Sequence, residues 1–186
     1  KVSGEPVVGI INNRTRGFHY RLVESCEIEL VDLYSPIGIR VLHRSSTFIL
    51  LKACHDVLPD EKLVIRHTIS NGVYCEFLNR EIKPEDVELI KNRMQELIDA
   101  DITIKRHDLT LEQAAAIFKR QGQPEKIKLF EYRNKERVYL FELDGYYDFF
   151  YNHVGYRTGI VKQFKLIPYR AGMVLQTEDE NGQIAP

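Results

Sequence analysis

Residues 63–98 read LVIRHTISNGVYCEFLNREIKPEDVELIKNRMQELI, and this stretch carries the strongest structural signals in the chain. Two runs rich in β-branched and aromatic residues, 63–65 and 73–77, flank the turn Asn71-Gly72, which is typical of a β-hairpin. Pro84 then opens an amphipathic segment with acidic residues in its first turn and apolar residues at helical spacing. The stretch predicts a hairpin followed by a helix from Pro84 to Ile98, a combination typical of an α+β fold.

Upstream of this stretch, strand patterns give way to a helical pattern. The expected strands alternate polar and apolar residues or are short apolar runs: 7–11, 18–22, 27–33 and 39–42. Turns are expected at Asn12-Asn13 and at residues 35–38, which read Ser-Pro-Ile-Gly. From residue 45 the apolar residues take helical spacing, Ser45 or Ser46 can cap the helix, and Pro59 ends it.

Downstream, strands and helices alternate. A capping box of Thr110 and Gln113 predicts a helix through Lys119, and Pro124 begins a short helix that reaches about Tyr132. The expected strands are 102–105, 137–143 and, as the last one, 160–167. The chain lacks an initiator Met and ends in a polar tail without periodicity, so we expect an excised region of a longer polypeptide.

Composition narrows the class of protein. The 186 residues are 44% apolar and 28% charged, and 26 Lys and Arg against 27 Asp and Glu leave a net charge of -1. Bulk positive charge therefore does not drive binding to nucleic acid, although a local basic patch stays open, for example one of Arg66, Arg157, Lys162 and Lys165. The apolar runs are too short to span a membrane. Three cysteines at irregular spacing predict a reducing, cytoplasmic compartment.

The residues predict neither a metal site nor a phosphate-binding loop. The six histidines are scattered, and the sequence has no Cys-x-x-Cys and no Gly-x-x-x-x-Gly-Lys motif. Two interpretations of Cys54 stay open, a core residue of its helix or a nucleophile with a His that is adjacent only in space. His67 and Cys75 flank the predicted hairpin and can face each other across it.

An aromatic and polar cluster occupies residues 144–159. It holds four tyrosines, two acids, a His and an Arg among glycines. Such a cluster is typical of a recognition loop in which rings and Arg stack on a base. Alternatively, the rings fill the core against a sheet and the polar tips form its rim.

Several separate phrases resemble the editing domain of threonyl-tRNA synthetases. Residues 67–76 (HTISNGVYCE) are similar to the family's I-x-N-G-F-Y-Y-D stretch, and residues 84–97 are similar to its T-x-E-D-x-x-x-I-E-x-R-M-x-E-L helix. Residues 8–45 look like the latter part of a TGS domain, a small β-grasp unit that precedes the editing domain. Residues 70–76 and 145–152 are most similar to phrases of bacterial uridine kinase-like proteins, which carry this pair of units ahead of a P-loop kinase.

This resemblance implies three parts. Residues 1–44 would form a partial β-grasp (TGS) unit, residues 45–175 an editing-domain-like antiparallel sheet with packed helices, and residues 176–186 a flexible tail or linker. The resemblance also implies a kinase domain of the same chain, C-terminal to this region. ATP and Mg are expected only for that domain, and no cofactor or metal is expected in residues 1–186.

The resemblance departs at the family's catalytic positions. Its editing domains use His-x-x-x-His on the first helix and Cys-x-x-x-His in a late loop. The first pair falls on Phe48 and Lys52 here, and the second pair falls on Phe150 and Val154. These side chains cannot rebuild a metal-binding or water-activating set. The resemblance therefore implies that hydrolysis of mischarged tRNA is lost and that the cleft persists with an apolar floor.

We therefore expect a non-catalytic ligand-binding or regulatory region that presents a cleft to a nucleotide or an RNA end and does not enter a membrane. The expected cleft residues are His67, Asn71, Tyr74, Cys75, Tyr147, Asp148, Tyr151, His153, Arg157 and Thr158. Two alternatives remain: an active deacylase with a new set such as His67 and Cys75, and a simple RNA-binding module.

Overall fold

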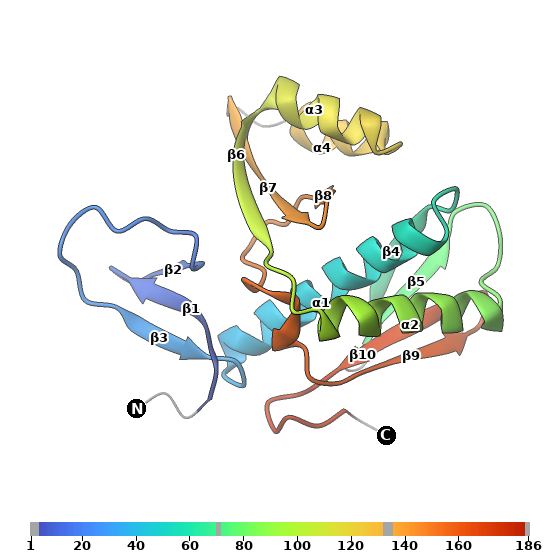
Figure 1. The fold of residues 1–186 in the computed structure, drawn as a ribbon, viewed down its shortest axis with the longest axis horizontal. Helices are drawn as coiled ribbons and strands as arrows, with labels where there is room; N and C mark the ends of the chain where they lie inside the picture. The colour runs from blue at the N-terminus through green and yellow to red at the C-terminus, as the bar shows by residue number, and fades with distance from the viewer. Residues whose placement is uncertain (1–3, 70–71, 132–135, 185–186) are drawn as a thin grey trace.

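The computed structural model describes residues 4–69, 72–131 and 136–184, and within them the chain forms antiparallel sheets with packed helices. Figure 1 shows a small sheet on one side, a larger sheet under two long helices, and a third sheet that carries the remaining helices. The α+β class expected from the sequence is confirmed. No helix in the described ranges is long and apolar enough to cross a bilayer.

The small sheet has the strand order β2-β1-β3, built from β1 (Pro6–Ile11), β2 (Arg14–Arg16) and β3 (Glu29–Asp32). The predicted turn at Asn12-Asn13 is confirmed, because both residues have positive φ, as a two-residue hairpin turn of this type requires. The expected strand at 18–22 is wrong, since these residues are irregular in the structure. A β-grasp identity for this sheet stays a proposal.

Helix α1 (Pro36–Val57) begins nine residues before the predicted start at Ser45, and the expected strand at 39–42 is wrong. Ser35 is the N-cap, since its Oγ accepts a hydrogen bond of 3.1 Å from the Gly38 backbone, and Pro36 occupies the first turn. Ser45 lies inside the helix, where its hydroxyl donates to the Val41 carbonyl at 2.7 Å. The expected boundary between residues 44 and 45 falls within α1.

The main sheet has the order β4-β5-β10-β9, formed by β4 (Leu63–Ile69), β5 (Gly72–Phe77), β9 (Phe164–Tyr169) and β10 (Gly172–Thr177). The predicted strands at 63–65 and 73–77 are confirmed as part of β4 and β5, while the turn residues Ser70 and Asn71 lie outside the described residues. The predicted last strand at 160–167 is wrong in position. It begins at Phe164, runs through Pro168 on the edge of the sheet, and is followed by β10, which reaches into the expected tail.

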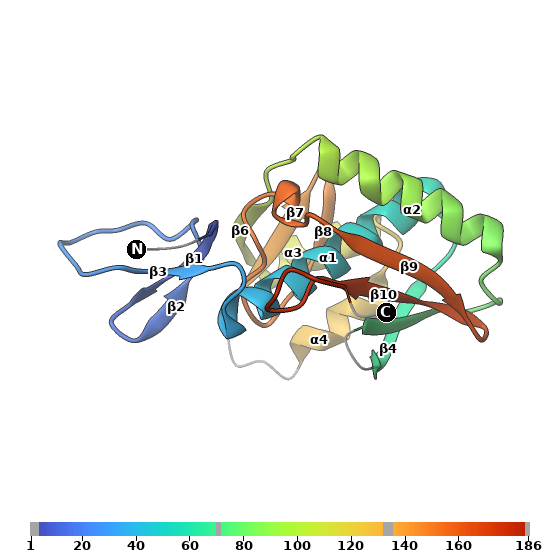
Figure 2. The same ribbon diagram turned by 90° about the horizontal axis from the view of Figure 1, so that it is seen from below.

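Helices α1 and α2 (Pro84–Asp99) lie side by side on one face of the main sheet (Figures 1 and 2). The predicted start of α2 at Pro84 is confirmed. Phe48 and Ile49 of α1, Ile90 and Met94 of α2, and Met173 of β10 are fully buried and belong to one apolar core. Burial of these faces is the main source of stability for this unit.

The third sheet has the order β6-β7-β8, formed by β6 (Lys105–Thr110), β7 (Arg137–Leu143) and β8 (Tyr146–Asp148). It carries α3 (Leu111–Arg120), a 3-10 turn (Pro124–Ile127) and α4 (Lys128–Glu131); Tyr132, the expected end of this helical stretch, lies outside the described residues. The capping box of Thr110 and Gln113 is confirmed, and β6 replaces the expected strand at 102–105. This unit has its own core of Ala114, Phe118, Phe130, Val138 and Leu140.

A candidate ligand cleft on helix α1

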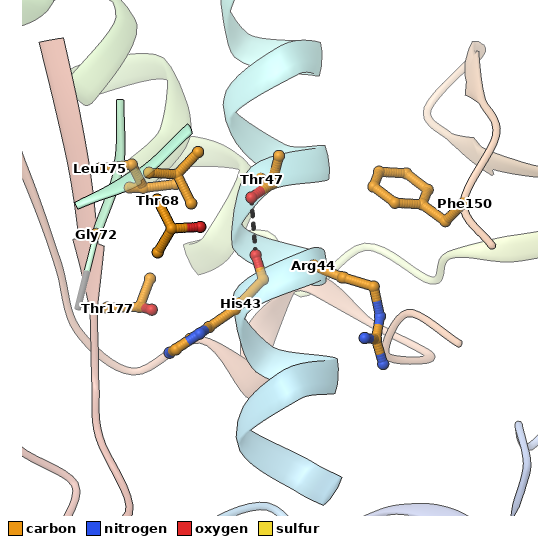
Figure 3. Close-up of a pocket in the computed structure, with 9 residues that line it drawn as sticks. His43, Arg44, Thr47, Thr68, Gly72, Phe150, Leu175 and Thr177 are labelled. Atoms are coloured by element: carbon orange, nitrogen blue, oxygen red, sulfur yellow. Dashed lines mark hydrogen bonds between the residues drawn. The ribbon is translucent and has the colours of Figure 1, made fainter. Parts of the chain in front are cut away.

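A cleft of about 240 Å³ lies over the first half of α1, between the main sheet and the loop that follows β8. Figure 3 shows α1 at its centre, with β-strand residues on one side and Phe150 on the other. The lining residues are His43, Arg44, Thr47, Thr68, Gly72, Val73, Phe150, Leu175 and Thr177. The wall is thus part apolar and part polar, as in small-molecule sites.

The polar groups of the cleft come chiefly from one face of α1. His43 and Thr47 are one turn apart, and the Thr47 hydroxyl donates to the His43 carbonyl at 2.9 Å (Figure 3). His43 Nε2 lies 3.4 Å from the Glu178 carbonyl oxygen. Burial lowers the pKa of His43, although the contact with Glu178 acts in the opposite direction. A neutral imidazole therefore faces the cleft at neutral pH and can donate or accept a hydrogen bond.

His43 also borders a second hollow, of about 300 Å³, on its other side. This hollow is lined by Ile39, His43, Asp179, Glu180 and Asn181. Backbone amides of Gln183 and Asn181 hold the pKa of Asp179 below its usual value, so its carboxylate is charged. His43 therefore lines both hollows.

Of the four positions at which the resemblance implies a catalytic set, Phe150 lines the cleft and Phe48 packs against Phe150. The rings of Phe48 and Phe150 meet edge to face with centroids 5.3 Å apart, and Phe48 is fully buried. Val154 is 2% exposed. Hydrocarbon therefore fills three of the four positions.

Lys52, the fourth position, is engaged in a network of ion pairs. Its Nζ lies 2.7 Å from Asp56 Oδ1 and donates to the Asp144 carbonyl at 2.9 Å. Asp56 also accepts from Arg93 of α2 at 2.9 Å, and Arg93 pairs with Glu96. The amine thus links α1, α2 and the turn between β7 and β8. Its ammonium group is therefore engaged in contacts within the fold.

The residues that the sequence suggested as cleft residues fall into three separate groups in the structure, and the first group lies on the β4–β5 hairpin. His67 pairs with Tyr74 in the sheet register, and Cys75 pairs with Ile65, so the prediction that His67 and Cys75 face each other is wrong. A bulge between Ile65 and His67 shifts the register. The rings of His67 and Tyr74 are 5.3 Å apart, whereas Cys75 is fully buried in the core with α1. Asn71 lies outside the described residues.

A second group holds the third sheet together. Asp148 Oδ2 pairs with Lys126 at 2.6 Å, and its Oδ1 accepts from the Phe149 backbone. Tyr147 exchanges backbone hydrogen bonds with the Gln121 side chain, at 2.7 and 2.8 Å. Tyr151 packs edge to face on Phe149 and is 74% exposed.

A third group joins the loop after β8 to the rest of the molecule. Arg157 pairs with Glu5 at 2.5 Å and with Asp101. The Thr158 hydroxyl donates to the Leu97 carbonyl at 2.6 Å. His153 Nε2 lies 2.9 Å from the Thr15 carbonyl. Of the ten suggested residues, none lines the α1 cleft among those the structure describes.

The cleft residues on α1 were missed because residues 39–42 read as a strand. The Ser35-Pro36 pair was the signal that could have found them, because Ser is a preferred N-cap and Pro is favoured at the first helical position. Starting the helix there places His43 and Thr47 one turn apart, with Arg44 next to His43.

The cysteines of the core are unsuited to nucleophilic attack. Burial raises the pKa of Cys54 and that of Cys75 to about 12. Both side chains are therefore thiols at neutral pH, and the thiolate is the nucleophile. In the described ranges no three His, Cys, Asp or Glu side chains are arranged to hold a metal ion.

The chain is similar to threonine–tRNA ligases over most of its length. The enzyme of Geobacter sp. (strain M21) is 29% identical over 161 residues, which are 86% of this chain and 25% of the ligase. That of Syntrophotalea carbinolica is 27% identical over 183 residues, 97% of this chain and 28% of the ligase. That of Burkholderia lata is 30% identical over 149 residues, 79% of this chain and 23% of the ligase.

The chain thus spans about a quarter of the length of these curated relatives. No protein-family model matches it. Similarity to part of a tRNA synthetase agrees with the resemblance to an editing-like domain that the sequence motifs indicated.

Proposed function

We propose that this chain is a non-catalytic binding module with an editing-like fold, and that the cleft on α1 receives the end of a nucleotide or an RNA strand. The proposal rests on the residues at the four positions where the resemblance implies catalytic side chains. Phe48, Phe150 and Val154 are packed apolar side chains, and Lys52 is paired with Asp56. The side chains at these four positions supply no base, nucleophile or metal set to activate water, and among the described residues His43 alone in the cleft wall has no nucleophile or metal set beside it.

The cleft chemistry suits a small polar group attached to a flat ring. Phe150 offers an aromatic wall, while Thr47, Thr177 and neutral His43 offer hydroxyl and imidazole partners. A volume of about 240 Å³ is smaller than most sites for drug-sized ligands, so it accommodates one nucleoside or amino acid and not a longer stretch of strand.

Calorimetric titration with nucleosides, nucleotides, threonine and tRNA tests the binding role. Thr47→Val should weaken the positive member of that panel at least tenfold, because a hydroxyl in the wall is replaced by a methyl. Thr103→Val is the matched control, since Thr103 is exposed and does not line the cleft. The absence of measurable binding to every member of the panel would contradict the proposal.

A deacylation assay on Ser-tRNA and Thr-tRNA tests the absence of catalysis. We expect no rate above spontaneous hydrolysis, and no change in Cys75→Ala, because that thiol is buried on the core side of the sheet. A measurable rate that His43→Ala or Cys75→Ala abolishes would favour the alternative, an active deacylase with a new residue set.

The finer proposal is that this module regulates a uridine kinase-like domain in the same cytoplasmic polypeptide. Its support is the similarity of residues 70–76 and 145–152 to phrases of that family. ATP and Mg would bind that domain, since residues 1–186 contain no Gly-x-x-x-x-Gly-Lys loop. Reading the open reading frame beyond codon 186 tests it, and the absence of a Gly-Lys-Ser/Thr loop there would contradict it.

A further inference from the structure

Positively charged and imidazole side chains lie within electrostatic range of one another on five segments: β2, the loop that follows it, α1, β6 and the loop after β8. We call this set the basic junction: Arg16, His19, Arg44, Arg106 and His153. The Arg44 Nε donates to the His153 carbonyl at 2.7 Å, and His153 in turn contacts the Thr15 carbonyl. A side chain at position 17 would begin only 3.2 Å from His153 Nδ1, so the two loops are in close contact.

The arginines of the basic junction create a positive electrostatic field around its two imidazoles. Burial lowers the pKa of His153, and the cations of Arg106, Arg44 and Arg16 lower it further. Burial likewise lowers the pKa of His19, with further lowering by Arg106 and His153. Each imidazole therefore lies in a positive field, and protonation there is disfavoured.

The carboxylates near this field are engaged with other side chains. Glu142 contacts His107 at 2.7 Å and Lys105 at 3.8 Å, and Asp108 pairs with Arg137 at 2.9 Å. Among the ion pairs formed within the described ranges, none includes Arg16, Arg44 or Arg106. The positive charge of the junction is thus not neutralised by these pairs.

Two buried polar atoms of the junction lack hydrogen-bond partners in the part of the chain that the structure describes: Arg16 Nε and His19 Nε2. A buried polar atom without a hydrogen-bond partner is energetically unfavourable, so a ligand that pairs with it gains affinity. Arg16 also stacks over Tyr20 at 4.6 Å, and Arg106 over Tyr139 at 4.3 Å. Tyr20 is 37% exposed and Tyr139 is 48% exposed, so each ring keeps exposed surface although an arginine stacks over it.

We propose that the basic junction binds the phosphate groups of single-stranded RNA, with the exposed tyrosines available to stack on bases. Unneutralised arginines that flank accessible rings are the combination that single-strand binders use. This inference rests on the proposed function, and it extends the α1 cleft along the strand, because Arg44 lines the cleft and belongs to the junction. The net charge of -1 restricts such binding to this local surface.

The test measures fluorescence anisotropy of a labelled single-stranded oligoribonucleotide at several salt concentrations. The double variant Arg16→Gln/Arg106→Gln should bind at least tenfold more weakly, and the slope of log K against log salt should fall by about 1.4, or 0.7 per lost phosphate contact. Arg106→Lys should keep most of the slope. Arg137→Gln is the control, since that arginine belongs to the same sheet but is paired with Asp108.

Parallel arms identify the ligand. Inorganic phosphate and a nucleoside monophosphate test free phosphate, and duplex RNA tests base stacking. The proposal is overturned if the single strand binds wild type and double variant equally, or if free phosphate competes as well as the oligonucleotide. Thermal melts of each variant exclude loss of fold. Nucleoside binding that depends on Thr47 separately reports the cleft, so failure of the junction and failure of the cleft give different results.

Discussion

Replacing Asp56 by Asn should reveal how far the Lys52 network has become structural. The side chains of Lys52 and Asp56 are 8% and 19% exposed, and the two oxygens of Asp56 serve Lys52 at 2.7 Å and Arg93 at 2.9 Å. Removing one partner of a buried pair costs about 3–5 kcal/mol. In the variant, Lys52 still donates to the Asp144 carbonyl and Arg93 still pairs with Glu96. We therefore expect a loss of about 3 kcal/mol in the free energy of unfolding, at the low end of that range.

Urea titration followed by circular dichroism measures this loss in the free energy of unfolding, and a thermal melt should show a decrease of about 6–12 °C for a chain of this size. Glu88→Gln is the control. Glu88 pairs with Lys91 at 3.5 Å on the exposed face of α2, and its loss should cost at most about 0.5 kcal/mol. If Asp56→Asn lowers the free energy of unfolding no more than Glu88→Gln does, the Lys52 network does not hold α1, α2 and the β7–β8 turn together.

Three further outcomes are expected. In native protein an aromatic disulfide reagent should titrate Cys26 quickly and leave Cys54 and Cys75 unreacted until urea is added, because burial raises the pKa of both to about 12; three fast thiols would contradict this. Phe118→Ala should cost about 3–5 kcal/mol and abolish hydrogen-exchange protection in β6–β8 before that in α1, since Phe118 belongs to the separate core; uniform loss would refute that separation. Burial is the main cause that lowers the pKa of four histidines: His19, His43, His55 and His153. The unfolded chain therefore binds more protons below about pH 6.5, and the free energy of unfolding should fall as the pH decreases from that point; a urea midpoint equal at pH 7.5 and 5.5 would contradict this.

The sequence predicts those elements whose ends are fixed by interactions between residues close together in the chain. The start of α2 at Pro84 and the capping box at Thr110 follow from side chains and backbone within one turn. The start of α1 was missed because residues 39–42 have the aliphatic and β-branched character of a strand, while Ser35 and Pro36 decide the conformation. Strand β10 was missed because its polar end, Gln176-Thr177, reads as tail and its pairing with β5 depends on residues about a hundred positions away.

The candidate site depends even more on long-range contacts. Phe150 meets Phe48 only after the third sheet folds back on α1, and His153 contacts the Thr15 carbonyl across more than a hundred residues. Periodicity reports which face of an element is apolar, but it does not report which elements meet. The aromatic cluster at 144–159 divides between both of its interpretations: Tyr146 is buried in the core, while Tyr151 is exposed.

The continuity of α1 has a consequence for how the chain can be divided. A helix of 22 residues is about 33 Å long, and this one starts beside β3 and continues under the cleft without a break. One unbroken helix therefore carries the connection to β3 at its start and the cleft residues His43 and Thr47 near its middle. Dividing the polypeptide at residue 45 for separate expression would cut this helix in two and separate His43 and Arg44 from Thr47, which lines the same cleft.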